Sequence, residues 1–205
     1  MVGLWDYDKA RNLVRRYGIR SVESSYVKNG DDAARFANGG PIVLKVLSEK
    51  ALHKSRSGLI RLNLYTKDDI TAAYSDLEKK AQQLRPYKVM AQKMVRGGTE
   101  IIIGGNTDQQ FGKMILIGLG GIYVETFKDF ALRVCPITDF DAQSMLNQMR
   151  SKAVIAPSEE AESMIKSLLI SAAKMFAENE ITEFDLNPLI LHDGTYDAVD
   201  LRVMG

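Results

Sequence analysis

The sequence predicts an α/β (α+β) fold built from two lobes. Helix-like and strand-like segments alternate up to about residue 87, and strands then follow one another closely. A long helical segment is stopped by Pro86, because proline interrupts a helix, and this separates the two halves. We therefore expect an N-terminal lobe over residues 1–87 and a C-terminal lobe over residues 88–205. Clefts between lobes are common ligand sites, so we expect a ligand cleft between the two.

The elements of the first lobe follow from caps and periodicity. Asp6 is placed to cap a first helix that Gly18 ends. A continuous apolar run at 41–47 predicts a buried strand, and alternation at 57–65 predicts its neighbour. Thr66 then opens a long helix. The expected order is helix 7–17, strand 20–27, helix 31–37, strand 41–47, strand 57–65 and helix 67–85.

The second lobe is predicted to be rich in strands. Glycine-containing segments separate the first three of them, as turns do. Asp139 or Asp141 is placed to cap a helix, and Pro157 with Ser158 introduces the last helix. The expected order is strands 88–95, 99–105, 113–120 and 130–137, then helices 142–150 and 159–180, and finally a hairpin over 183–203.

Composition narrows the classes of function. The formal net charge is +1, which argues against a protein defined by non-specific nucleic-acid binding. The N-terminal segment lacks the pattern of a signal peptide, and the longest apolar run is too short to span a bilayer. The single cysteine, Cys135, lies in an apolar run and fits an inert thiol in a reducing compartment. We expect a cytoplasmic protein with no membrane or nucleic-acid partner.

The terminal hairpin carries more carboxylates than a strand needs. Asp193–Gly194 is a strong signal for a two-residue type I′ turn. That turn fixes the register and puts Asn187 opposite Asp200, and Asp185 opposite Arg202. Directly paired residues point to the same face of a sheet. Pro188 tolerates a bulge or an edge, so the alternative is a slip of the register by one residue near Asn187, which would break this pairing.

Asn187 and Asp200 would present two hard oxygen ligands side by side. Mg²⁺ is usually held by one or two protein groups together with waters and substrate phosphates. The pair is too sparse for a free-standing metal cage and suits a metal that arrives with a nucleotide. The alternative is a solvent-facing strand with ordinary polar residues, which spacing alone does not exclude.

A second candidate site lies between the strands at 41–47 and 57–65. Lys45 interrupts an apolar run, and a buried lysine needs an anionic partner, although it could also extend its amine to solvent at the strand end. The following segment contains His53, Lys54, Ser55 and Gly58, a mixture of cations, a hydroxyl and a glycine that can surround phosphate oxygens. His53 alone would be an ordinary surface histidine, and a nucleophilic role would require a neighbouring phosphate.

Four segments taken together resemble a known family. They are "PIVLKVLSEKALHKSRSGLIRLNL", "VMAQKMVRGGTEIIIGGNTDQQFGKMILIGLGGIYVETFKD", "ALRVCPI" and "EFDLNPLILHDGTYDAVDLRV". In this order they resemble the ATP-grasp domain of nucleoside-diphosphate-forming acyl-CoA synthetases, which include the β subunit of ADP-forming acetate–CoA ligase. The β subunit of succinyl-CoA synthetase is a more distant relative. The resemblance covers about residues 10–203 and implies an ATP-grasp fold with a nucleotide cleft.

The resemblance implies an enzyme that converts acyl-CoA, ADP and phosphate reversibly to the acid, CoA and ATP. Its cofactors would be ATP or ADP and Mg²⁺, and its partner a separate CoA-binding α subunit, in an α2β2 assembly. His53 would relay the phosphoryl group, and Arg133 would steady its charge. The implied nucleotide contacts are Lys45, His53, Lys54, Ser55, Gly58, Gln92, Val95 and Glu100, and the implied metal ligands are Asn187 and Asp200.

The sequence departs from the family pattern after His53. The family usually reads "HK[ST]DVGGV", and this chain reads "HKSRSGLI". Arg56 replaces an acid and Leu59 replaces the second glycine, and leucine cannot reach the backbone conformations of glycine. Two alternatives follow: a nucleotide-binding regulatory or catalytically impaired ATP-grasp module, or a ligase that forms acyl-phosphates without a histidine relay.

Overall fold

The computed structural model describes residues 3–48, 50, 58–121 and 129–205. The chain forms two compact units: unit 1 comprises Met1–Ser21 with Gly97–Gly205, and unit 2 comprises Val22–Arg96. This division differs from the expected lobes 1–87 and 88–205. The N-terminal segment belongs to unit 1 because it joins the chain's other end: the Trp5 amide donates to the Val203 carbonyl over 2.9 Å. Local sequence patterns carry no signal for such a contact.

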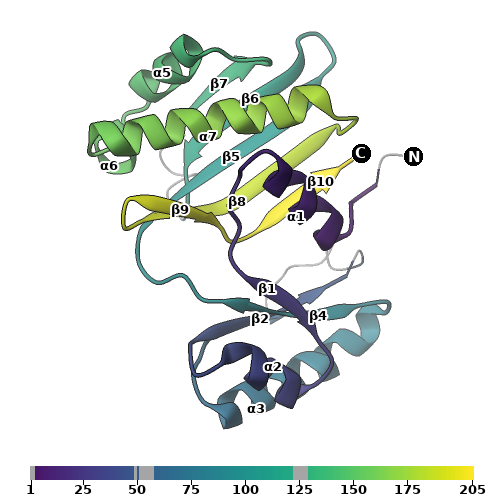
Figure 1. Cartoon of the computed structure of the whole chain (residues 1–205). Coiled ribbons are helices and arrows are strands. Elements are labelled where there is room, and N and C mark those ends of the chain that lie inside the picture. The colour runs from purple at the N-terminus through teal and green to yellow at the C-terminus, as the bar shows by residue number, and fades with distance from the viewer. Residues whose placement is uncertain (1–2, 49, 51–57, 122–128) are drawn as a thin grey trace. The chain divides into compact units, whose positions relative to one another are not determined.

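Unit 2 is a four-stranded antiparallel sheet with two helices (Figure 1). The strands lie in the order β1-β4-β2-β3, and α2 and α3 pack against each other. Thr66 and Asp69 form a capping box at the start of α3. The elements are β1 (Ser24–Val27), α2 (Gly30–Ala37), β2 (Ile42–Leu47), β3 (Ile60–Leu64), α3 (Lys67–Ala81), the 3-10 helix η2 (Gln82–Leu84) and β4 (Lys88–Lys93).

Unit 1 is built on a six-stranded antiparallel sheet in the order β10-β8-β5-β6-β7, with β9 paired to β8. Helix α7 packs on β5 and β6, and α5 packs on α7 and β7 (Figure 1). The elements are α1 (Tyr7–Arg16), β5 (Thr99–Asp108), β6 (Gly112–Leu119), β7 (Phe130–Val134), α5 (Asp139–Gln148), α6 (Lys152–Ile155), α7 (Glu159–Glu178), β8 (Glu183–His192), β9 (Thr195–Ala198) and β10 (Leu201–Met204).

The core of unit 1 explains one glycine of β5. Phe176 of α7 and Phe184 of β8 meet edge to face, with ring centroids 5.3 Å apart. A Cβ atom at Gly105 would lie 2.4 Å from the ring of Phe184, so only glycine fits beneath this aromatic pair. The contact fixes β8 against β5 and α7, and β8 is the strand that carries Asn187.

The expected caps and ends hold with small shifts. Gly18 follows α1 at a φ of +74°, as expected of a glycine that ends a helix. Thr138, rather than Asp139 or Asp141, is the N-cap of α5, and Asp141 completes the capping box as its third residue. Residues 20–23 are not part of the expected strand, which begins at Ser24. Across the described ranges, no helix is long and apolar enough to cross a bilayer.

Candidate functional site

The terminal hairpin has the predicted turn and register. Asp193 and Gly194 both have positive φ values, +47° and +70°, as a type I′ turn requires. β9 pairs with β8 so that Leu189 lies opposite Ala198. The Asn187 amide donates to the Asp200 carbonyl over 3.1 Å, which confirms that these two residues are cross-strand neighbours.

The hairpin keeps one register throughout, because β10 also pairs Asp185 with Arg202 as predicted. A shift by one residue, the alternative that Pro188 raised, occurs on the other side of β8, where this strand pairs with β5. There the register changes between Ile101 and Ile103, so that Asn187 and Pro188 stand opposite the single residue Ile102. This is a β-bulge, and bulges re-aim side chains next to functional sites.

The bulge keeps the apolar side chains of β8 on one face but changes which positions of the strand supply them, because Leu186 lies opposite Ile103 and Leu189 lies opposite Ile101. Phe184 and Leu186 are buried before it, and Leu189 and Leu191 are buried after it. Asn187 is exposed and Asp200 is partly exposed. Their side chains supply an amide oxygen and a carboxylate, the hard donors that Mg²⁺ prefers. Within the described ranges no group of three or more His, Cys, Asp or Glu residues could hold a metal ion.

Lys45 lies on the face of the unit 2 sheet opposite the helices. Its neighbours Leu44 and Val46 belong to the core with α2 and α3, so the Lys45 side chain projects to the other face. There it pairs with Met90 of β4, and Gln92 lies two residues further along that strand. Lys45 and Gln92 are both buried, and a buried ammonium and amide beside one another favour an anionic, hydrogen-bonding ligand.

Lys93 provides a structural contrast on the opposite face of the same sheet. Its ammonium donates to the carbonyls of Phe36 and Ala37 over 2.9 and 2.7 Å. These are carbonyls at the C-terminal end of α2, which a cation stabilises. Lys93 therefore holds a helix end, whereas Lys45 lies on the face where Gln92 also lies.

Gly58 is the first described residue of the segment that follows His53. His53, Lys54 and Ser55 lie outside the described residues. Gly58 has a φ of +95° and so occupies the conformation that needs glycine. Leu59 has no positive φ; it is buried in the core of unit 2 and its carbonyl accepts from the Val46 amide over 3.0 Å. Leu59 therefore fits its own position without strain, and the effect of this departure on nucleotide binding stays a prediction.

A charged cluster holds the backbone at Gly58. The Arg61 guanidinium donates to the carbonyls of Gly58 and Ile60 over 3.1 and 2.8 Å, and it forms an ion pair with Asp76 of α3. Lys80 donates to the same carboxylate over 3.0 Å. The hydrogen bond from Lys80, followed by that from Arg61, lowers the pKa of Asp76. Helix α3 thereby fixes the point at which the chain enters β3.

Glu100 and Val95 flank the start of β5. Glu100 is exposed, and its carbonyl accepts from the Gly120 amide over 2.7 Å. Its neighbour Ile101 is fully buried, so the Glu100 side chain points away from the core of unit 1. Val95 is partly buried and follows the end of β4, where the Met94 amide donates to the Pro41 carbonyl.

Arg133 of β7 is engaged with α5. Its guanidinium donates to Ser144 over 2.8 Å and to Gln148 over 3.1 Å. These bonds tie the edge strand to the helix, and its role in steadying phosphate charge stays a prediction. Nearby, burial raises the pKa of the Cys135 thiol to about 11. Such a thiol stays protonated at neutral pH and is a poor nucleophile, in agreement with an inert role.

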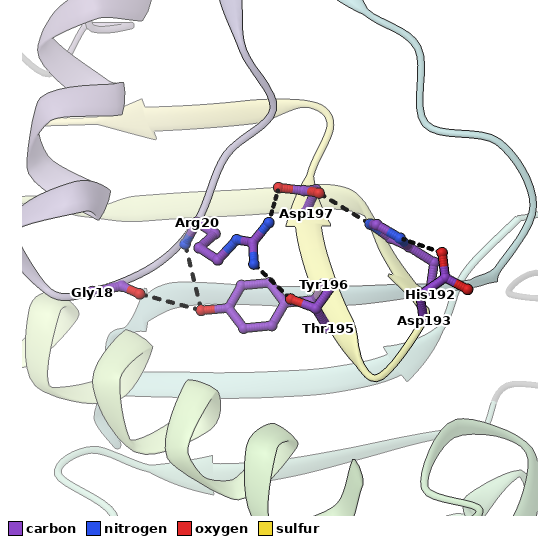
Figure 2. A network of polar contacts seen from close by, with 7 residues as sticks. All are labelled: Gly18, Arg20, His192, Asp193, Thr195, Tyr196 and Asp197. Carbon is purple, nitrogen blue, oxygen red and sulfur yellow. Dashed lines mark hydrogen bonds and ion pairs between the residues drawn. The ribbon is translucent and has the colours of Figure 1, made fainter.

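Figure 2 shows a polar network that sequence reasoning missed. The His192 ring lies 3.0 Å from the Asp197 carboxylate, and Arg20 approaches the same carboxylate to 3.5 Å. Arg20 also donates to the Thr195 hydroxyl over 2.7 Å. The predicted register already held one signal, because His192 and Asp197 occupy diagonal positions on one face of the hairpin. The sequence carried no signal for the contact of Arg20, which lies 175 residues from Thr195 along the chain.

The comparisons define the class of protein. A family model described as an ATP-grasp domain matches residues 3–204, so this chain belongs to the ATP-grasp domain family. More narrowly, it is homologous to the β subunits of ADP-forming acetate–CoA ligases. It is 31% identical to the β subunit of acetate–CoA ligase (ADP-forming) II of Pyrococcus furiosus, over 96% of this chain and 89% of that subunit.

Two further relatives define the range of the similarity. The chain is 34% identical to acetate–CoA ligase (ADP-forming) I of Archaeoglobus fulgidus, over 94% of this chain but only 30% of that larger protein. It superposes on the acetyl-CoA synthetase 1 of Ca. Korarchaeum cryptofilum, solved with CoA and Ca-AMPCP. The TM-score is 0.86 at 31% identity, over 99% of this chain and 93% of that one. The same enzyme has been solved with Mg-AMPPCP and a phosphohistidine segment pointing towards the nucleotide-binding site.

Proposed function

We propose that this chain is the nucleotide-binding β subunit of an ADP-forming acyl-CoA synthetase. The reaction converts acyl-CoA, ADP and phosphate reversibly to the free acid, CoA and ATP. The observation that carries the proposal is the hairpin register, which makes Asn187 and Asp200 neighbours in a chain of the ATP-grasp family. The names of the Pyrococcus and Archaeoglobus relatives, both ADP-forming acetate–CoA ligases, support the reaction class.

Asn187 and Asp200 fit a Mg²⁺ ion that binds together with a nucleotide. Two adjacent oxygen donors are few for a protein-only site but sufficient when phosphate oxygens complete the coordination. Bound Mg²⁺ would neutralise charge on the nucleotide phosphates. Asp200 already accepts a hydrogen bond from the Leu201 amide over 3.1 Å, which orients its carboxylate at the end of the hairpin.

The remaining proposed contacts serve the nucleotide. Lys45 would bind phosphate oxygens through its ammonium, a charge-assisted hydrogen bond of the stronger kind. Gln92 and Val95 would contact the adenine, and Glu100 a ribose hydroxyl. The proposed phosphate-binding segment comprises Lys54, Ser55 and Gly58, and the cluster of Arg61 with Asp76 holds its C-terminal end at Gly58.

His53 is the proposed phosphoryl carrier. A neutral imidazole nitrogen forms a bond to phosphorus as the bond to a phosphohistidine of the α subunit breaks. An oxygen of ADP then attacks the same phosphorus, and the bond to His53 breaks to give ATP. Protonation of the imidazole would remove the attacking lone pair. Arg133 is proposed to steady the phosphoryl charge during the transfer.

The partner follows from the reaction. The name of the Pyrococcus relative, a β subunit, supports a separate CoA-binding α subunit as the partner of this chain. We propose an α2β2 assembly that acts in the cytoplasm. The acid would be selected largely by the α subunit.

Phosphohistidine labelling tests the proposal. The chain and a CoA-binding α subunit from the same host are incubated with ATP labelled in its γ-phosphate, CoA and acid. We expect an acid-labile label on this chain that His53→Ala abolishes. Normal nucleotide affinity with no label would instead favour the regulatory module suggested by Arg56. Acyl-phosphate release without a protein label would favour a ligase that lacks the relay.

A further inference from the structure

The chain crosses between its two units twice, and the unit 1 residues next to each crossing contact the same hairpin, β8–β9. The first crossing follows Ser21 and the second precedes Gly97. Before the first crossing, the Ala198 amide of β9 donates to the Arg20 carbonyl over 3.1 Å, and Ser21 forms a bridge with Ala198. The residues leading into the first crossing are therefore backbone-bonded to β9.

After the second crossing, the chain lies on the other strand of the same hairpin. Gly98 has a φ of +96°, and a Cβ atom there would lie 2.4 Å from the Leu191 carbonyl and 3.2 Å from Cβ of His192. Thr99 then pairs with Leu191 in the ladder of β5 and β8. Only glycine allows the backbone to approach β8 this closely. The last residues of β8 and the whole of β9 thus support both crossings.

The side chain of Asp197 contacts a residue beside each of the two crossings (Figure 2). One carboxylate oxygen lies 3.5 Å from the Arg20 guanidinium, which belongs to the first crossing. The other lies 3.0 Å from the ring of His192, the residue against which Gly98 packs. The Asp197 side chain is only 14% exposed, so water screens these contacts weakly. Among the residues of Figure 2, Asp197 is the one whose side chain contacts both Arg20 and His192.

The buried phenol of Tyr196 makes further hydrogen bonds to the segment that leads into the first crossing. The Tyr196 hydroxyl donates to the Gly18 carbonyl over 3.3 Å and lies 3.4 Å from the Arg20 amide that donates to it. Burial raises the pKa of Tyr196, so the phenol stays neutral and keeps both bonds. Residues 18–21 are thus held by a backbone hydrogen bond from Ala198, by the hydroxyl of Tyr196 and by the ion pair between Arg20 and Asp197.

The same hairpin carries the proposed metal ligands. Ala198, which bonds to Arg20, lies opposite Leu189, two residues from Asn187. β9 ends there, two residues before Asp200. The amides of Val199 and Asp200 both donate to the Pro188 carbonyl, over 3.0 and 3.4 Å. A displacement of β9 at Asp197 would therefore reach Asn187 and Asp200 through a continuous set of backbone bonds.

We propose that Asp197 is a positioning residue for the metal site. It fixes the β8–β9 hairpin to both crossings and thereby holds Asn187 and Asp200 at the separation that a Mg²⁺–nucleotide requires. Mg²⁺ is a sensitive reporter because it demands near-ideal octahedral geometry. This inference rests on the proposed function.

The test uses the full chain with ADP and Mg²⁺ as probes. Asp197→Asn removes the charge that Arg20 and His192 share while keeping the shape of the side chain. We expect ADP affinity measured with Mg²⁺ to fall roughly two- to thirtyfold, the range found for coupling through contiguous contacts. Affinity measured in EDTA should not change. Asp8→Asn, which removes an ion-paired carboxylate of α1 in the same unit, is the matched control and should change neither.

Hydrogen exchange of the ligand-free chain gives a second readout. Asp197→Asn should speed exchange at the Ala198 amide and also at the Asn187 amide, and Asp8→Asn should not. If Asp197→Asn does not fold, Arg20→Met replaces it, and Arg20→Lys should restore part of the effect. Unchanged Mg²⁺-dependent affinity in a folded variant, or an equal loss in EDTA, would overturn the inference.

Asp200→Asn separates this inference from the proposed function. If wild-type ADP affinity does not depend on Mg²⁺, or if Asp200→Asn leaves that dependence intact, the metal site itself fails and the inference fails with it. If Asp200→Asn abolishes the dependence and Asp197→Asn does not alter it, only the positioning role of Asp197 is wrong.

Discussion

The Asn187 amide donates to the Asp200 carbonyl over 3.1 Å, and this bond joins the two halves of the terminal hairpin at the position where β8 bulges. The bulge disturbs the pairing with β5 and leaves the hairpin register intact. Asn187 therefore keeps Asp200 as its neighbour while its own side chain faces away from the core. The candidate metal site results from this combination of a strict turn and a tolerated bulge.

Asn187→Ala tests the metal site directly. Removing one of two protein ligands should lower Mg²⁺-dependent ADP affinity by at least about tenfold, since even outer-shell changes at metal sites cost that much. Calorimetry with and without Mg²⁺ measures the effect. Glu183→Ala, an exposed residue of the same strand, is the control and should bind as the wild type does. Equal affinities for both variants would count against Asn187 as a ligand.

Lys45→Met tests the phosphate contact against a matched lysine. A hydrogen bond from a charged group contributes about 1.5–3 kcal/mol, so ADP affinity should fall by roughly ten- to a hundredfold. Lys93→Met removes a lysine that bonds to the end of α2 instead, and it should lower the thermal midpoint without changing ADP affinity. The assignment of Lys45 is wrong if the two variants bind ADP equally well.

The register of the hairpin could be predicted from sequence because it is local. Asp193 and Gly194 are adjacent, and a type I′ turn leaves no choice in the pairing that follows. The bulge was only partly foreseen, since Pro188 shows that a ladder bond is missing but not which neighbour loses it. The same holds for α5, where Asp139, Thr138 and Asp141 are all able to cap and only the backbone decides.

The division into units could not be predicted from sequence. It depends on contacts between the two ends of the chain, such as the bond from Trp5 to Val203. The expected strand over 20–27 is shorter in the structure, where β1 comprises Ser24–Val27, for a related reason. Arg20 and Ser21 alternate as a strand would, but they bond to β9 of unit 1 instead of joining the sheet of unit 2. Periodicity describes an extended segment and does not identify its partner.

Leu59→Gly tests the departure from the family pattern. Leu59 is buried in the core of unit 2 and does not need a positive φ. Restoring the family's glycine should therefore destabilise the fold by about 2–5 kcal/mol, as loss of a buried leucine does, without raising ADP affinity. Leu59→Ala separates the lost side chain from the added backbone freedom. Tighter ADP binding by the glycine variant would show that the departure impairs the site.

Asp76 gives a prediction on pH. Hydrogen bonds from Lys80 and then Arg61 lower its pKa below the ordinary 3.8, so its contribution to stability is complete above that value. The contribution is lost as the pH falls through the lowered pKa, because the protonated carboxyl no longer pairs with either cation. The thermal midpoint of Asp76→Asn should lie below that of the wild type at pH 7, and the gap should close in acid. A gap that persists below the lowered pKa would contradict this account.

Arg133→Met tests whether this arginine acts on the phosphoryl group or only on α5. The variant loses the bonds to Ser144 and Gln148, so its thermal midpoint should fall. Ser144→Ala removes one of the same bonds and leaves the charge in place, which makes it the control.

If Arg133 steadies the phosphoryl group, turnover of the complex with its α subunit should fall in Arg133→Met well beyond the fall in Ser144→Ala. Arg133→Lys should then recover only part of the turnover, because lysine keeps the positive charge but lacks the fork of donors of the guanidinium. Losses of turnover that simply follow the thermal midpoints in all three variants would assign Arg133 to the packing of β7 on α5 alone.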